Sequence, residues 1–101
     1  MNEQELLFNE IGEQVDGATK GQLFGKACFK MGKKAFCCFF ENCMVFKLPQ
    51  PAHAEALNLE GAELFDPSGK GRPMKEWVQI PYNSSKKWLH YANISAHYVS
   101  K

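Results

Sequence analysis

The chain has 101 residues, of which 45% are hydrophobic and 23% charged, and its net charge is +1. This length predicts one domain over residues 1–101, and this composition excludes a disordered chain. No apolar run approaches the roughly 18 residues of a membrane span, and the acidic N-terminus does not resemble a signal peptide, so we expect a cytoplasmic protein with reduced thiols and no membrane contact.

The charges are segregated along the chain. Residues 1–19 carry five acids and no base, and residues 20–50 carry six lysines against Glu41. Residues 51–66 then carry four acids, and residues 67–101 carry six bases against Glu76. Such blocks can give the surface an acidic and a basic side that attracts anions, although ordinary solvated faces are the alternative interpretation.

The first predicted element is an amphipathic helix over residues 2–16. Asn2 is the expected N-cap, and Gly17 follows its end. Gly12 weakens this helix slightly but leaves room for a strand to approach closely. The apolar residues that recur at helical spacing are Leu7, Phe8, Ile11 and Val15.

Aromatic and β-branched residues with short polar breaks predict strands after this helix. In chain order we expect strands at 22–31, 35–40 and 43–48, a helix at 52–59, strands at 62–65 and 74–80, and a last helix from a cap at Asn83 or Ser84 to about Tyr98. The order α-β-β-β-α-β-β-α predicts an α+β domain with an antiparallel sheet of about five strands.

All four cysteines lie in the stretch CFKMGKKAFCCFFENC, residues 28–43. With a three-residue turn at 32–34 and a two-residue turn at 41–42, Cys28 lies opposite Cys38, and Cys38 lies opposite Val45. Cys37 then falls on a purely apolar core face. The opposite face carries Lys26, Cys28, Lys30, Phe36, Cys38, Phe40, Cys43, Val45 and Lys47.

Three interpretations of the cysteines are open. A zinc site is disfavoured because paired C-x2-C spacing is absent, so we expect no metal and no cofactor. A reversible Cys28–Cys38 or Cys38–Cys43 disulfide would make the protein a redox sensor, since neighbouring lysines would lower the thiol pKa. We favour the third interpretation, in which the cysteines are small hydrophobes on a covered face.

That face is too apolar to meet water alone. Either the C-terminal helix packs on it, or a second copy of the chain does, which would make the protein a homodimer. The interface candidates are Cys28, Phe36, Cys38, Phe40, Val45 and Trp77.

The loop DPSGKGRP, residues 66–73, carries Lys70 and Arg72 on a glycine-rich backbone of the kind that can hold a phosphate. It lacks the spacing of a P-loop. A nucleic-acid-binding regulator is therefore an alternative function, with contacts around Trp77 and Phe40. Its anion-binding candidates are Lys26, Lys30, Lys47, Lys70 and Arg72.

No catalytic set is apparent. The histidines His53, His90 and His97 lie outside any GxSxG or HExxH context, and the acids are not paired across a predicted cleft. We therefore expect no catalytic residues and no enzymatic activity.

The segment LFGKACFKMGKKAFCCFFENCMVFKL resembles the opening of the TfoX N-terminal domain family. GAELF, MKEWVQIP and WLHYA resemble its later strands and closing helix, and the related MmcQ/YjbR-like proteins are also similar. The resemblance spans roughly residues 5–98, with Lys26 in place of the family's usual second glycine. It implies a compact α+β domain with a bent antiparallel sheet and no established catalytic residues. We therefore expect a regulatory or protein-interaction module with an unknown protein partner.

Overall fold

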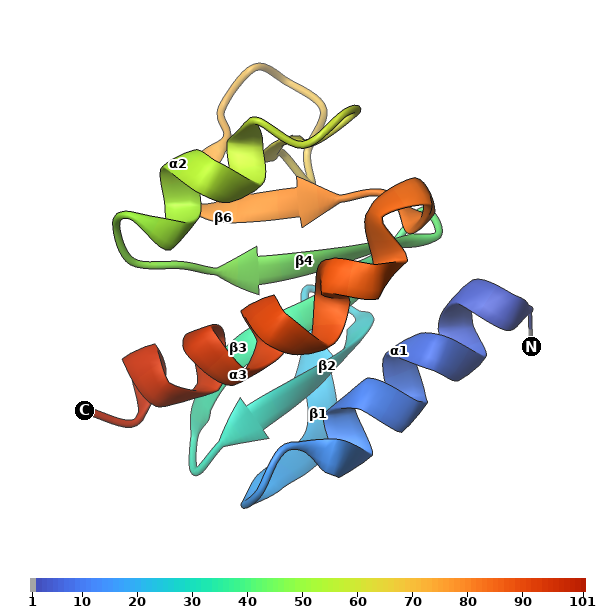
Figure 1. Ribbon diagram of the computed structural model, residues 1–101, viewed down its shortest axis with the longest axis vertical. Helices are drawn as coiled ribbons and strands as arrows, with labels where there is room; N and C mark the ends of the chain where they lie inside the picture. The colour runs from blue at the N-terminus through green and yellow to red at the C-terminus, as the bar shows by residue number, and fades with distance from the viewer. Residues whose placement is uncertain (1) are drawn as a thin grey trace.

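The computed structural model describes residues 2–101 and contains a six-stranded antiparallel sheet with its α-helices on one face (Figure 1). In chain order the elements are α1 Glu3–Gln14, β1 Ala18–Leu23, β2 Lys26–Met31, β3 Lys34–Phe40, β4 Cys43–Lys47, α2 Ala52–Leu57, β5 Glu63–Phe65, β6 Met74–Ile80, a 3₁₀ helix Tyr82–Lys87 and α3 Trp88–Val99. The strand order is β1-β2-β3-β4-β6-β5. The predicted α+β class is confirmed, with one strand more than expected.

The first helix forms as its sequence predicts. The Asn2 side chain accepts a 2.8 Å hydrogen bond from the Glu5 amide, and Gly17 follows the helix with φ +81°. Gly12 packs directly on Phe29 of β2, because a Cβ atom at this position would lie 2.1 Å from the ring. The cost of a glycine inside a helix is therefore offset by close packing between α1 and the sheet.

The predicted strand over residues 22–31 is wrong, because the segment is a hairpin of β1 and β2. Phe24 and Gly25 form a two-residue turn between the paired Leu23 and Lys26, with φ values of +54° and +74°. Phe is a strong strand former, so the sequence favours a continuous strand through this turn. The extra strand of the sheet arises here.

The pairing of β3 with β4 matches the sequence prediction. Glu41 and Asn42 form the tight turn, with φ values of +48° and +64°. Cys38 lies opposite both Cys28 and Val45, as expected.

A β-bulge turns Phe36, one of the predicted interface residues, to the other face of the sheet. The register of β2 and β3 shifts between Phe29 and Lys30, so that Lys30 lies opposite Ala35. Phe36 therefore turns to the helix side and is fully buried in the main core, while Ala35 packs on the opposite face. The prediction that Phe36 shares a face with Cys38 is wrong, because alternation fails at a bulge.

The buried hydroxyl of Ser95 connects α3 to the two central strands. Its oxygen lies 2.5 Å from the carbonyl oxygen of Phe36 and 2.6 Å from that of Lys47. The paired register of β3 and β4 ends one residue earlier, at Cys37 and Phe46. Ser95 thus supplies a donor where the two strands part, and it donates to one carbonyl at a time.

The last helix begins differently from the prediction. The 3₁₀ helix precedes α3, and neither start has a side-chain cap. Asn83 instead donates to the carbonyl of Glu60 over 3.4 Å, and the buried Trp88 indole donates to the carbonyl of Ile80 over 3.2 Å. Across residues 2–101, no helix is both long and apolar enough to span a membrane.

Ser95→Ala should lower the free energy of unfolding by about 1–3 kcal/mol, because it leaves buried carbonyls without their donor. Ser100→Ala is the matched control, since that hydroxyl bonds the Ala96 carbonyl at the exposed end of the same helix. Urea denaturation of both variants measures the difference. Equal losses would show that the Ser95 hydrogen bond contributes nothing specific.

Candidate functional site

The cysteine-bearing face of the sheet forms a second core. Its buried members are Cys28, Cys38, Val45, Phe65 and Trp77, and all of them except Trp77 have no exposed surface. The cysteines lie within this cluster as small apolar residues, as the favoured interpretation expects.

The sheet covers this face itself by curling. Phe65 on the edge strand β5 lies 5.3 Å, between ring centroids, from Phe40 on β3, although β4 and β6 separate these strands. Three strand spacings in a flat sheet would amount to about 14 Å. The ring of Phe65 also lies 6.5 Å from that of Trp77. An edge strand therefore folds over the second core.

This arrangement determines what a partner can reach. The helix α3 packs on the opposite face against β3 and β4, so the alternative in which it covers the face of Cys28 and Cys38 is wrong. Of the six interface candidates, only Phe40 is more than slightly exposed. The Lys26 ammonium lies 5.0 Å from the centroid of that ring. In this conformation, Phe40 is the main residue among the six interface candidates that a second copy of the chain could contact.

Burial raises the pKa of all four thiols. Desolvation raises the pKa of Cys38 to about 12 and raises the pKa of Cys28 and Cys37 as well. The pKa of the partly exposed Cys43 is also raised, first by burial and then by the charges of nearby acids. Lys30 and Lys26 act to lower the pKa of Cys28 and Cys38, as expected, but desolvation outweighs their attraction and the net shift is upward. All four thiols are free, and within residues 2–101 no cluster of His, Cys, Asp or Glu is placed to hold a metal.

The glycine-rich loop carries its own anion. The Asp66 carboxylate accepts hydrogen bonds from the Ser68 hydroxyl at 2.9 Å and from the amides of Gly69 and Gly71 at 3.1 and 2.9 Å. These bonds lower the pKa of Asp66, with the Ser68 hydroxyl as the largest cause. A phosphate could use these amides only by displacing Asp66. Asp followed by Ser and Gly is a known turn signature, so the sequence did contain this signal.

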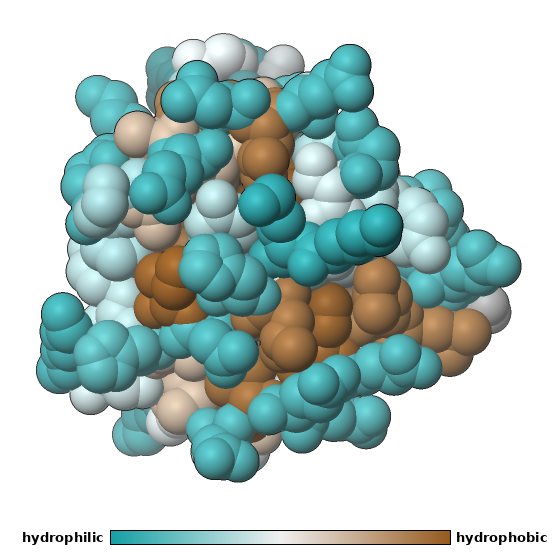
Figure 2. Space-filling model, viewed as in Figure 1, coloured by the Kyte–Doolittle hydropathy of each residue, from teal (hydrophilic) through white to brown (hydrophobic). Residues whose placement is uncertain are grey.

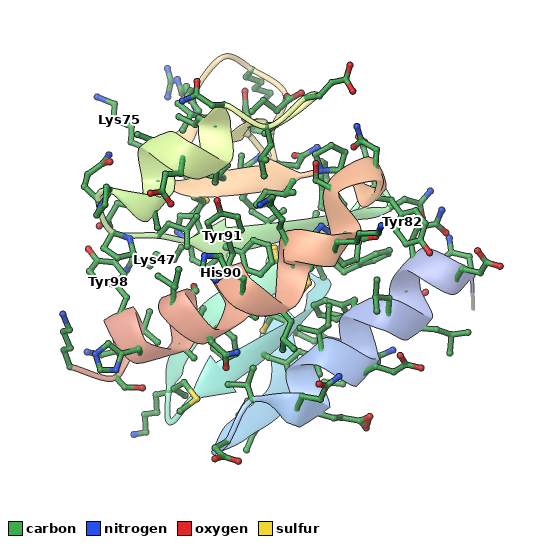
Figure 3. The ribbon with its side chains drawn as sticks, viewed as in Figure 1. Lys47, Lys75, Tyr82, His90, Tyr91 and Tyr98 are labelled. Atoms are coloured by element: carbon green, nitrogen blue, oxygen red, sulfur yellow. The ribbon has the colours of Figure 1, made fainter. Side chains whose placement is uncertain are left out.

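The five anion-binding candidates do not come together. Lys47 lies 3.8 Å from Glu76, whose other oxygen accepts a 2.7 Å hydrogen bond from Tyr98 (Figure 3). Lys26 lies over Phe40, next to the glycine-rich loop, whereas the Lys30 side chain crosses β1 at Gly21.

An acidic hollow adjoins that loop. It has a volume of about 410 Å³ and is lined by Phe40 together with Glu41, Glu63 and Asp66. These three carboxylates disfavour a polyanion in this hollow, and the predicted nucleic-acid contact at Phe40 stays a prediction.

A mainly apolar hollow lies on the helix side. A hollow of about 310 Å³ runs along the C-terminal half of α3 and is lined by Pro49, Asn93, Ile94, His97, Tyr98 and Lys101. A second hollow, of about 280 Å³, shares Asn93 and His97 with it and extends to the end of α1. A third, of about 390 Å³, shares Lys101 with the first and reaches the β2–β3 turn. We call the three together the α3 groove.

Apolar side chains accompany this helix at the surface. Figure 2 shows a broad apolar strip between α3 and α1 and a smaller apolar area on the other flank of α3. The sequence did not reveal the α3 groove, because its lining joins the end of the last helix to Pro49 and to the turn after β2, which lie far apart in the chain.

Comparisons of the chain with protein-family models, with curated proteins and with solved structures give no match. The TfoX-like family therefore stays a prediction from the sequence. The α3 groove and the curled sheet have to be interpreted from their own chemistry.

In the native protein we expect Cys43 alone to react with a thiol reagent at about pH 8, and more slowly than free cysteine, because its pKa is raised. Its rate should increase as the pH rises further, since the thiolate is the reactive form. Denaturant should release all four thiols. Rapid reaction of Cys28 and Cys38 without denaturant would contradict a closed second core.

Proposed function

We propose that this domain is a non-enzymatic interaction module that binds a short acidic segment of a partner protein in the α3 groove. The observation that carries the proposal is that three hollows border the C-terminal half of α3, on both sides of the exposed Asn93 and His97. A surface hollowed on both flanks of one helix fits an extended peptide segment better than a compact small molecule.

The charge around the groove indicates the sign of the segment. Lys33, Lys34 and Lys101 line the hollow next to the β2–β3 turn, and Asp16 is the acidic residue that lines the hollow at the end of α1. Cations that outnumber acids at a rim attract a negatively charged partner and speed its association. Ile94 and Tyr98 supply an apolar wall for an anchoring side chain.

One wall of the groove is held in place. Tyr98 donates to Glu76 on β6, and Lys47 on β4 pairs with the same carboxylate. The Glu76 carboxylate raises the pKa of Tyr98, because the hydrogen bond favours the neutral phenol. A preformed wall reduces the entropy lost on binding.

The proposal includes the setting that the sequence suggests. A TfoX-N-like regulatory domain would act in the cytoplasm, where its free thiols stay reduced. It could act as a homodimer, but a second copy would need a surface other than the closed cysteine face.

Twelve-residue peptides rich in Glu around one Leu or Phe should bind the protein, and matched peptides with Lys for Glu should not. Ile94→Glu should weaken binding about tenfold, because it places a like charge at the anchor site. Leu6→Glu is the control, since Leu6 is 48% exposed on α1 and does not line the groove. Fluorescence anisotropy measures the affinities.

Amide chemical shifts of the unaltered protein give an independent readout. Shifts on peptide addition should be confined to α3, the Pro49 segment and the β2–β3 turn. Equal binding of both peptide charges, or shifts outside these segments, would contradict the proposal.

A further inference from the structure

The tip of the β1–β2 hairpin presents an aromatic ring to solvent. Phe24 is 56% exposed, more than the other large apolar side chains in the described part of the chain. It occupies the first position of a two-residue turn with φ +54°. Asn or Gly is usual there, and a bulky side chain is strained by this backbone conformation. Folding alone would favour a different residue at this position.

A positive φ is not sufficient evidence of function, because Glu41 has φ +48° in the next tight turn. The two residues differ in how favourably their side chains interact with water. A carboxylate at a hairpin tip is well hydrated, whereas an exposed phenyl ring gains nothing from water. Strain combined with an exposed ring indicates that the ring has a use outside the fold.

The strands behind this ring are basic. Residues 17–40 contain five lysines and no acid. On the second-core face of β2, Lys26 lies opposite Leu23 and Lys30 lies opposite Thr19. The Lys30 side chain crosses β1 at Gly21, where a Cβ atom would lie 2.9 Å from Lys30 Cε. Gly21 thus gives Lys30 the room to reach across the edge strand.

We propose that the β1–β2 hairpin binds single-stranded nucleic acid, with a base stacked on Phe24 and phosphates bound by Lys26 and Lys30. Aromatic stacking on unpaired bases and lysine contacts to the backbone are how many proteins hold single strands without sequence preference. The outer edge of β1 has no strand partner among the described residues, so its backbone groups are also accessible.

The spacing of the lysines favours a linear polyanion over a membrane surface. Lys26 lies opposite Leu23 and Lys30 opposite Thr19, one and five residues before Phe24, so they lie roughly 3 and 17 Å behind the tip at about 3.3 Å per residue. A flat headgroup layer touching Phe24 would leave Lys30 out of reach. A strand running down the hairpin can contact both.

Charges elsewhere fix the path of the strand. The acidic hollow beside Phe40 lies near the tip of the β1–β2 hairpin. Cys38 pairs with Cys28, and the strands are antiparallel, so Phe40 lies two residues closer to that tip. The acidic helix α1 packs on the opposite face of the sheet. The Lys26 ammonium lies 5.0 Å from the Phe40 ring at the border of this hollow, so a phosphate contacts it from the β1 side. The proposed path runs from Phe24 toward Lys30 along the outer side of β1 and β2.

The test uses the full chain and a fluorescein-labelled oligothymidylate of about 12 nucleotides. We expect binding at low salt that weakens with rising salt, with a logarithmic slope near −1.4 for two phosphate contacts. Phe24→Ala should weaken binding about 5- to 100-fold through the loss of one stacked base. Lys30→Gln should weaken it and make the slope shallower.

Phe24→Asn separates a binding role from a structural one. Asn suits the left-handed turn, so this variant should unfold at a higher urea concentration while losing binding as Phe24→Ala does. Leu6→Ala is the control and should leave binding unchanged, because Leu6 is the next most exposed large apolar side chain after Phe24 among the described residues.

The following outcomes overturn the proposal: no binding of the oligothymidylate at low salt, unchanged binding by Phe24→Asn, or equal binding to the same strand in a duplex. Binding to phosphatidylserine vesicles instead of the oligonucleotide, lost in Phe24→Asn, would overturn it in favour of a membrane surface.

Discussion

The contact between Phe65 on β5 and Phe40 on β3 determines how the two faces of the sheet are used. It can form only if the sheet curls, because two strands separate these residues in the strand order. The curl closes the second core over Cys28 and Cys38, so that this apolar face needs no external partner to cover it. What a partner can reach is consequently displaced to the α3 groove and to the β1–β2 hairpin.

Local patterns were sufficient to predict much of the fold. The Asn2 cap, the Glu41-Asn42 turn and the pairing of Cys38 with Cys28 and Val45 depend on neighbouring residues and were predicted correctly. The hairpin at Phe24 and the bulge that turns Phe36 inward were not. At Phe24 a tight turn occurs despite the strand propensity of Phe, and at Phe36 a bulge breaks strict alternation, and a single sequence reveals neither.

The candidate site was less predictable, for physical reasons. The alternation of side chains along the strands was enough to predict an apolar face that carries cysteines. Whether that face is covered depends on the curl of the sheet, which involves the three-residue strand β5. Long-range contacts of this kind leave no periodic signal. The turn at Asp66 in the loop of residues 66–73 could be predicted, because Asp, Ser and Gly at this spacing are typical turn residues. Its Gly69 and Gly71 amides donate to Asp66 and are therefore not free for a phosphate.

Proton–proton nuclear Overhauser spectroscopy on selectively labelled protein tests the curl most directly. A closed second core predicts cross-peaks between the ring protons of Phe65 and those of both Phe40 and Trp77, whose centroids lie 5.3 and 6.5 Å from that of Phe65. Absence of these cross-peaks in folded protein, with the Phe65 ring accessible to a soluble paramagnetic probe, would show that the cysteine face is open. It would then again be the leading candidate for an interface.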